Sequence, residues 1–502
     1  MQGLLSSGHP LISEAGADIL RAGGNAFDAI VAAAFTSTFL EPTMASLAGA
    51  GFVLARTSSG EEILFDFIAA APGRAHPGPP DDGDRHFYPV DILFGDIPQE
   101  FTIGLASAAV PGTLKGLVHV HRRLGRLPLA EVVAPAIAAA RAGTVITPFV
   151  SDSLQLMFPV LRDSPAGTAL FLDDGKVLPA GGLHRNPEMA DFLETLPRDP
   201  RGFYGGDFAA AIERDMLEGG GLMTRADLAQ YEVIERRPLS VAYRGRRVLT
   251  NPPPALGGSL MALRLLLREE ADLSGCRWGS RAHVTATARA LEQAVRLRGG
   301  AAVPRDPAHA ELLEGIHAPL IHAVQGTTHL NASDTEGNVA ALSMSNGSGS
   351  SYFLPGTGIH FNNMMGEVDL HPAGFHTSEP GDRVASMMSP TLLLEGDQVL
   401  AALGTGGSNR IPSAVSQVAS SLLDLGLSPD EASNLPRMHF DGERLQIEPG
   451  FPEEAMAALE AEWDVSLWPH KNLYFGGVHV VAPRVGRFGA DRRREGHGIV
   501  VE

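Results

Sequence analysis

The sequence predicts a mixed α+β fold that forms a single compact unit. Residues 327–345 alternate in side-chain character on both sides of a turn, which indicates a β-hairpin with one face against a core. Amphipathic helical patterns occupy other stretches, including residues 129–142 and 208–219. No Pro/Ser-rich linker or low-complexity tract divides the 502 residues, so the chain is not expected to split into independent domains.

The composition argues against several classes of protein. The net charge of −19 is spread over interspersed acidic and basic residues, which argues against nucleic acid or a membrane surface as partner. Cys276 is the only cysteine, so we expect neither an intrachain disulfide nor a cysteine metal cluster. The most apolar run, residues 29–40, is too short to span a bilayer. The chain carries no motif for a nucleotide, a flavin or a metal, and we expect no cofactor.

The N-terminal region predicts a helix followed by two strands. A helix begins after Asn25, a favoured N-cap residue, and carries Phe27 and Ile30 at helical spacing until it ends before Pro42. Strands follow at residues 52–56 and 62–67. The first residues lack the features of a signal peptide. We therefore expect a cytoplasmic protein, or a periplasmic or secreted one only if a leader precedes this sequence.

The predicted hairpin begins at Gly326. Its first strand places one set of side chains on one face (Thr328, Leu330, Ala332) and a second set on the other (Thr327, His329, Asn331, Ser333). Residues 334–338, DTEGN, have turn chemistry, and residues 339–345 form the return strand. The hairpin therefore carries a threonine at its open end.

A threonine in this position has two interpretations. If the chain cuts itself between Gly326 and Thr327, the new terminus carries its own general base, an α-amine with an ordinary pKa of about 7.7–8.0. Gly326 suits this step because glycine permits strained backbone and lets the Thr327 hydroxyl approach the preceding carbonyl. The alternative is an ordinary strand whose threonine lies on the solvent face.

The motifs around this threonine resemble those of a known family. They are TTH (327–329), DTEGN (334–338), SMSNG (343–347) and PGTGI (355–359), together with SGHPLISEAGADILRAGGNAFDA (7–29), EPTMASLAGAGF (41–52), GTGGSNRI (404–411) and ADRRREG (490–496). In this order they resemble the gamma-glutamyltransferase (gamma-glutamyltranspeptidase) family of N-terminal nucleophile hydrolases. The resemblance implies a four-layer αββα sandwich. It also implies a large (alpha) subunit of residues 1–326 and a small (beta) subunit of residues 327–502, which stay together as partners.

The resemblance implies roles for further residues. Ser345 matches a hydroxyl that orients the nucleophile, and Asn346 matches an asparagine that holds the amino-acid end of the substrate. Gly406 and Gly407 match the glycine pair whose N–H groups stabilise the tetrahedral oxyanion. Without the resemblance, residues 404–407 would be read as an ordinary turn.

The implied substrate pocket departs from the family pattern. Ile68 stands where glutathione-cleaving members have an arginine that binds the glutamyl α-carboxylate. Met364 and Met387 replace a glutamine and the second of two serines, whereas Glu367 and Ser386 keep the acid and the first serine. The segment between Glu367 and Ser386 is also short for the family, which implies an open site that favours hydrolysis over transfer.

We therefore expect a self-processing N-terminal threonine amidohydrolase that acts on a small amide other than an ordinary γ-glutamyl compound. Superfamily relatives act on oxamate, on glutaryl-type β-lactam side chains and on poly-γ-glutamate, which are candidates by analogy. One alternative is a glutathione hydrolase or γ-glutamyl transferase that binds the carboxylate through Arg383 or Arg410. Another is a binding or assembly protein that keeps the fold but does not mature. The sequence leaves homo-oligomerisation open.

Overall fold

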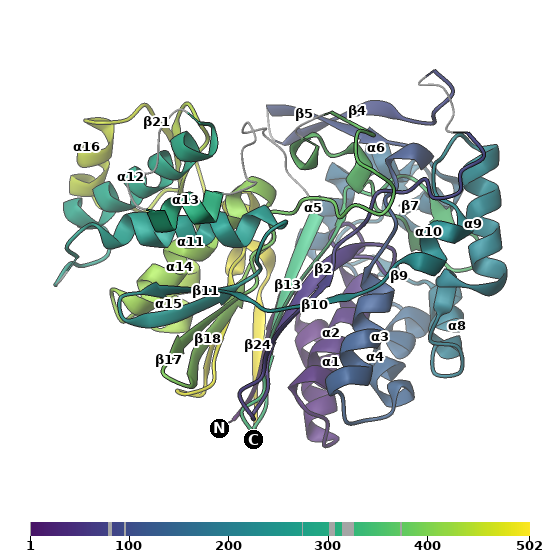
Figure 1. Cartoon of the computed structure of the whole chain (residues 1–502), viewed down its shortest axis with the longest axis horizontal. Coiled ribbons are helices and arrows are strands. Elements are labelled where there is room, and N and C mark those ends of the chain that lie inside the picture. Colours follow the sequence, from purple (N-terminus) through teal and green to yellow (C-terminus); the bar gives the residue numbers. More distant parts are fainter. Residues whose placement is uncertain are drawn as a thin grey trace.

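The computed structural model describes residues 2–78, 83–94, 97–273, 275–300, 307–313, 326–371 and 374–502. Two β-sheets lie face to face at the centre, and a layer of helices covers the outer side of each sheet (Figure 1). This is the αββα sandwich that the resemblance implied, and the predicted α+β class is confirmed.

The first sheet has seven strands, and each neighbouring pair is antiparallel. Their order is β10 (Ile234–Arg236), β3 (Glu62–Phe67), β2 (Ala50–Arg56), β14 (Val339–Gly347), β13 (Gly326–Ser333), β1 (Gly3–Ser7) and β24 (His497–Val501). The second sheet has six antiparallel strands in the order β11 (Leu239–Tyr243), β12 (Arg246–Thr250), β17 (Thr391–Glu395), β18 (Gln398–Gly404), β22 (His479–Ala482) and β23 (Arg487–Gly489). The sheets meet through β13, β14 and β1 on one side and β18 and β22 on the other.

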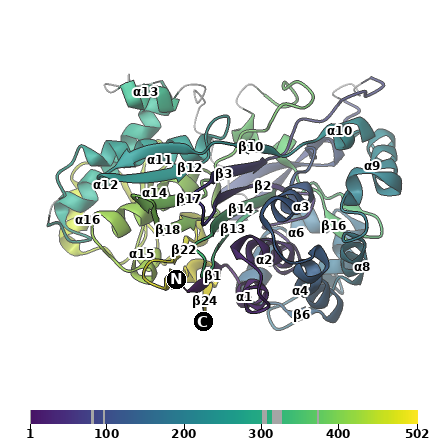
Figure 2. The same ribbon diagram turned by 60° about the horizontal axis from the view of Figure 1, so that its bottom comes forward.

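One helix layer covers the seven-stranded sheet. It contains α1 (Pro10–Arg21), α2 (Ala26–Leu40) and α3 (Thr113–Leu124), with α4 (Leu129–Ala142) and α8 (Pro187–Thr195) farther out. Figure 2 shows α1 to α4 and α8 together on this side of the strands. Every residue of α2 is buried, because the helix lies between the sheet and its neighbours α1 and α4. The predicted core helix is confirmed, including Asn25 as its N-cap in a capping box with Asp28.

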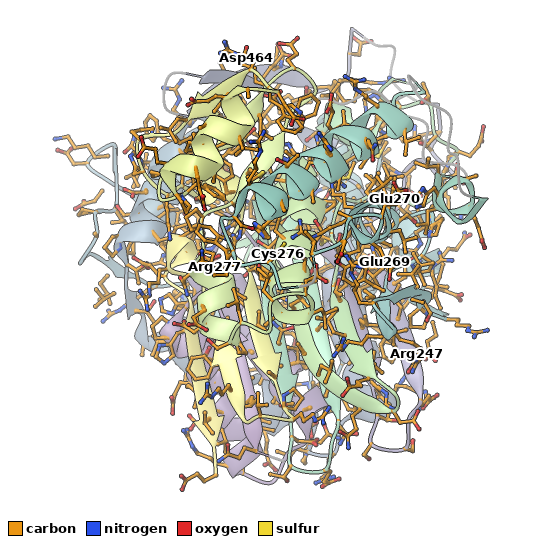
Figure 3. All side chains as sticks on the ribbon, turned by 90° about the vertical axis from the view of Figure 1, so that its left-hand side faces the viewer. Arg247, Glu269, Glu270, Cys276, Arg277 and Asp464 are labelled. Atoms are coloured by element: carbon orange, nitrogen blue, oxygen red, sulfur yellow. The ribbon has the colours of Figure 1, made fainter. Side chains whose placement is uncertain are left out.

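The other helix layer covers the six-stranded sheet. It contains α11 (Leu256–Glu269), α14 (Ile411–Leu423) and α15 (Pro429–Asn434), with α12 (Arg281–Arg298) and α16 (Glu453–Glu460) farther out. Cys276 is a partly exposed free thiol in the connection between α11 and α12 (Figure 3). In the part of the chain that the structure describes, no helix combines the length and the apolar character needed to cross a bilayer.

The remaining elements surround these layers. They are β4 (Tyr88–Phe94), β5 (Ile97–Ile103), β6 (Thr144–Val145), α5 (Pro148–Leu156), α6 (Phe158–Leu161), α7 (Pro165–Phe171), β7 (Leu172–Asp173), β8 (Lys176–Val177), β9 (Leu183–His184), α9 (Gly206–Glu218), α10 (Arg225–Gln230), α13 (Pro307–Leu313), β15 (Phe353–Leu354), β16 (Ile359–His360), β19 (Met438–Phe440), β20 (Leu445–Ile447) and β21 (Val465–Leu467). The predicted helices at 129–142 and 208–219 are α4 and α9, and the predicted early strands are β2 and β3.

Alternation along the central strands separates two cores. In β2, Val53 and Ala55 pack toward α2, whereas Phe52 and Leu54 pack between the two sheets. Because neither face of β2 meets water, residues 50–55 of this strand are apolar or glycine. The central strands are therefore packed on both faces, which fixes the position of the residues where these strands begin and end.

The hairpin of β13 and β14 lies at the centre of this arrangement (Figure 2). Asp334 closes its turn, since one carboxylate oxygen accepts from the N–H groups of Glu336 and Asn338 at 2.9 and 3.0 Å. On the Thr327 face, Asn331 donates to the His479 carbonyl of the second sheet at 3.0 Å. This face is buried between the sheets, so the solvent-face interpretation of Thr327 is wrong.

Candidate active site

Thr327 lies at the start of β13, directly opposite Ser345 on β14. A β-bulge separates it from Gly326, and its side chain is 2% exposed. The Thr327 hydroxyl donates to Ser345 Oγ at 3.3 Å, and Ser345 Oγ donates to the Gly326 carbonyl at 2.5 Å. A chain of two hydroxyl groups thus connects the candidate nucleophile to the carbonyl of the peptide bond that precedes it.

Gly326 occupies a position without room for a side chain. A Cβ atom there would lie 2.0 Å from the Thr43 carbonyl oxygen and 2.6 Å from that of Gly347. Glycine is required at this position for close approach of backbone to backbone. Residues 314–325, which precede it, lie outside the described residues.

Gly406 and Gly407 follow β18 and pack beside the nucleophile. A Cβ atom on Gly406 would lie 2.0 Å from the Thr327 carbonyl oxygen. Gly407 has a φ of +131°, which other residues rarely adopt, and it precedes a short 3-10 helix of residues Ser408–Arg410. The glycine pair is therefore more than an ordinary turn, since its backbone lies against that of Thr327.

A small cavity that opens to solvent lies at the Thr327 side chain. Seven of the residues singled out in the sequence line it: Ile68, Thr327, Ser345, Met364, Glu367, Ser386 and Met387. They come from five separate segments of the chain. Among the described residues, Asn346, Gly406 and Gly407 lie next to this site but are not part of the lining.

The lining is predominantly apolar. Ile68, Met364 and Met387 are joined there by Leu370, Met388 and Ile411, which sequence analysis did not single out. Glu367 is the one charged side chain among the described residues that line the cavity. Thr327 is 2% exposed and Glu367 and Ser386 are each 4% exposed, whereas the cavity itself opens to solvent, so the expectation of an open site stays a prediction.

Asn346 is buried beside the nucleophile with its carboxamide unused. The residue is 1% exposed, and neither its side-chain oxygen nor its side-chain nitrogen has a hydrogen-bond partner within the described structure. Buried amides are nearly always hydrogen-bonded, because burying one without a partner is costly. An unused carboxamide at this position is typical of a group that binds a ligand or a water molecule.

Neither arginine of the glutathione hydrolase alternative lies in the cavity lining as far as the described residues show. Arg383 stacks on the Tyr231 ring at 4.5 Å and donates to the Ile68 carbonyl at 2.6 Å. Arg410 stacks on the Tyr474 ring at 4.5 Å and donates to the Tyr474 carbonyl at 3.2 Å. Both guanidinium groups are therefore engaged by aromatic rings and backbone carbonyls, one of which belongs to the cavity residue Ile68.

Two charged residues that no sequence motif indicated reach the nucleophile strand. Arg494 Nη1 donates to the Thr327 carbonyl oxygen at 2.6 Å. Glu41, at the C-terminal end of α2, interacts with the Thr328 hydroxyl and is attracted by Arg494. Both residues lie in motifs that the sequence displays, but no local pattern shows that either charged side chain reaches Thr327 or Thr328.

The charge state of Glu41 predicts a pH-dependent stability. Burial raises the pKa of this carboxyl to about 7, although the Thr328 hydrogen bond and Arg494 oppose the rise. The folded protein therefore holds a proton that the unfolded chain releases near pH 4.5. The resulting stability is fully present below about pH 4.5 and is lost as the pH rises to about 7.

Replacing Glu41 by Gln is expected to remove this dependence. Between pH 5 and pH 8 the free energy of unfolding of Glu41→Gln should rise relative to the wild type by about 2 kcal/mol. Urea unfolding at pH 5, 6.5 and 8 measures the difference, with exposed Glu131→Gln as the control. A difference that stays constant across these pH values would contradict the expectation.

Comparisons with known proteins agree with this geometry. The profile of the family described as Gamma-glutamyltranspeptidase matches residues 12–323 and 318–501. The acylase ACY 1 proenzyme of Pseudomonas sp. (strain SE83) is 33% identical over 493 residues, which cover 92% of this chain and 86% of the relative. The glutathione hydrolase proenzyme of Escherichia coli (strain K12) is 30% identical over 504 residues, which cover 92% of this chain and 85% of the relative.

A solved structure extends the agreement to the fold. Cephalosporin acylase from Bacillus halodurans matches with a TM-score of 0.83 and 25% identity, over 99% of this chain and 95% of that one. The family profile, the relatives that match most of the chain and the similar fold all indicate one family. The chain belongs to the gamma-glutamyltranspeptidase family of N-terminal nucleophile hydrolases and is a self-processing hydrolase or acylase of that family.

Proposed function

We propose that the chain cuts itself between Gly326 and Thr327 and that Thr327 of the resulting small subunit hydrolyses an amide whose acyl group is not γ-glutamyl. The observation that carries the proposal is the cavity beside Thr327, where Ile68, Met364 and Met387 supply an apolar lining and no arginine is among the described lining residues. The products of self-cleavage are a large subunit of residues 1–326 and a small subunit of residues 327–502.

Self-cleavage uses the hydroxyl chain. The Thr327 oxygen attacks the Gly326 carbonyl carbon, the C–N bond breaks, and the nitrogen takes up a proton to become the free α-amine. Ser345 donates to the carbonyl oxygen that becomes negatively charged in this step. Water then hydrolyses the ester between residues 326 and 327, which restores the Thr327 hydroxyl and separates the two subunits.

Substrate turnover repeats this chemistry on an external amide. The Thr327 hydroxyl attacks the amide carbonyl while its α-amine accepts the proton, and the leaving amine departs with that proton. The N–H groups of Gly406 and Gly407 stabilise the oxyanion. Water, deprotonated by the same α-amine, releases the acid and regenerates the enzyme.

The lining favours an acyl group without a carboxylate. A carboxylate buried against Ile68, Met364 and Met387 would lose its hydration without gaining a cation, which costs several kcal/mol. Glu367 instead favours an ammonium or an N–H donor, and Ser386 and Asn346 offer further hydrogen bonds. Similarity to proteins named acylase ACY 1 and cephalosporin acylase supports an acyl amide, and the apolar lining favours an uncharged or amine-bearing acyl group over glutaryl.

A panel of acyl 4-nitroanilides tests the proposal. Wild-type enzyme is expected to cleave small uncharged or amine-bearing acyl anilides at least about tenfold faster, in kcat/KM, than γ-glutamyl 4-nitroanilide. Installing the missing cation with Ile68→Arg should raise kcat/KM on the γ-glutamyl substrate about tenfold or more, because a guanidinium binds a carboxylate with two hydrogen bonds. Ile68→Met introduces an unbranched side chain without a charge, so it should not raise kcat/KM on the γ-glutamyl substrate.

The glutathione hydrolase alternative makes the opposite prediction. Its support is the 30% identity with a glutathione hydrolase proenzyme. Efficient turnover of γ-glutamyl 4-nitroanilide by the wild type, together with its loss in Arg383→Met or Arg410→Met, would establish that alternative and refute the proposed acyl preference.

A further inference from the structure

Arg494 reaches the backbone of Thr327 through a passage that two glycines leave open. It belongs to a short 3-10 helix of residues Arg492–Arg494 near the C-terminus and is 5% exposed. A Cβ atom on Gly477 would lie 2.6 Å from its Cδ, and one on Gly406 would lie 2.5 Å from its Nη1. At the end of this passage, Nη1 donates to the Thr327 carbonyl oxygen at 2.6 Å.

Glu41 approaches the next residue of the same strand. A Cβ atom on Gly8 would lie 2.4 Å from its Oε1, so here too a glycine makes room for the charged group. The carboxyl interacts with the Thr328 hydroxyl, and its Oε2 has no hydrogen-bond partner within the described structure. Its attraction to Arg494 balances a buried cation with a buried acid.

We propose that Arg494 and Glu41 are positioning residues that fix the backbone of Thr327 and set the charge beside its α-amine, a role that rests on the proposed function of Thr327 as N-terminal nucleophile. The α-amine and the carbonyl that Arg494 binds belong to the same residue. After cleavage the amine is free to rotate, but the bond from Arg494 holds the carbonyl, and with it the Cα atom that carries both the amine and the hydroxyl side chain.

The pair also controls whether the amine is neutral, which it must be to act as a base. A cation one carbonyl away disfavours the ammonium form, whereas Glu41 favours it once its carboxyl is ionised, above about pH 7. Other charged groups surround the site: Glu367 in the cavity, Asp369 and Arg410 near the Ser408–Arg410 helix, and Arg437 and Asp491 behind Arg494. Burial lowers the pKa of His329 to about 3 and that of His479 to about 4, so neither carries charge near neutral pH.

Two substitutions should therefore move the pH profile in opposite directions. In Arg494→Gln the amine loses its cationic neighbour, so the acid limb of kcat/KM should move to higher pH by about one unit. In Glu41→Gln the carboxylate that forms above about pH 7 is missing and the cation stays unbalanced there, so the limb should move to lower pH. Both are measured on the cut enzyme with the 4-nitroanilide that the wild type cleaves fastest.

Control variants separate positioning from general damage. Arg492→Gln removes the same charge from a side chain that is 81% exposed, and its limb should match the wild type. Arg494→Lys keeps the charge but not the guanidinium geometry, so its acid limb should match that of the wild type while its kcat should be lower than that of the wild type. Glu41→Gln preserves the shape of the side chain. If Arg494→Gln does not fold, the position of the acid limb in Glu41→Gln tests the proposal by itself.

The outcomes distinguish this inference from the function on which it rests. A wild-type protein without a new N-terminus at Thr327 would refute the proposed function, and with it the positioning role of Arg494 and Glu41. A cut wild type whose acid limb is reproduced within a few tenths of a unit by both Glu41→Gln and Arg494→Gln would overturn the charge pair alone.

Discussion

Thr327→Ala is expected to persist as one 52.9 kDa polypeptide, whereas the wild type runs as two fragments on a denaturing gel. The substitution removes the oxygen that attacks the Gly326 carbonyl. The Ser345 hydroxyl faces the same carbonyl, but it does not belong to residue 327, whose own oxygen must take the acyl group from its nitrogen. Amide turnover should fall by about four orders of magnitude or more, because both the nucleophile and its free amine are lost.

Thr327→Ser is the matched control for this variant. Serine keeps the hydroxyl and lacks only a methyl group, so cleavage should persist. Intact mass and N-terminal sequencing of both variants measure the result. Two fragments from Thr327→Ala would show that another group cuts the chain. An uncut wild type would support the non-maturing binding protein instead.

Gly406→Ala is expected to produce the second largest loss. The added Cβ would lie 2.0 Å from the Thr327 carbonyl oxygen and 2.5 Å from Arg494 Nη1, closer than real Cβ atoms approach, so the backbone must move. Displacing an oxyanion donor should lower kcat by about 10²–10³-fold. KM should change little, because the glycine backbone is not part of the described cavity lining.

Gly205→Ala provides the control for this second variant. The nearest atom to a Cβ there is a terminal nitrogen of the Arg201 side chain at 3.6 Å, which leaves room for a methyl group. Steady-state kinetics of both variants, after confirming that each is cut, provide the measurement. Equal kcat in Gly406→Ala and the wild type would remove the glycine pair from the proposed mechanism.

Local features of the fold could be predicted because they depend on near neighbours in the chain. Alternation from Thr327 onward indicated the hairpin, Asp334 and Gly337 indicated its turn, and Asn25 indicated the start of α2. Each depends on backbone geometry and on hydrogen bonds within a few residues. The stacking of the two sheets came from family resemblance, since alternation shows that a face is buried but not what covers it.

The sequence by itself determined the threonine at the mouth of a hairpin and Gly326 before it, and the family resemblance implied the roles of Gly406, Gly407 and Ile68. Only the tertiary structure decided that Ile68, Met364 and Met387 line one cavity and that Arg494 bonds to Thr327 across 167 positions. Arg492 is 81% exposed whereas Arg494 is buried, although both belong to the same run of arginines. The physical reason is that charge and hydrophobicity are properties of a residue, whereas burial and pairing depend on which distant segments pack against it.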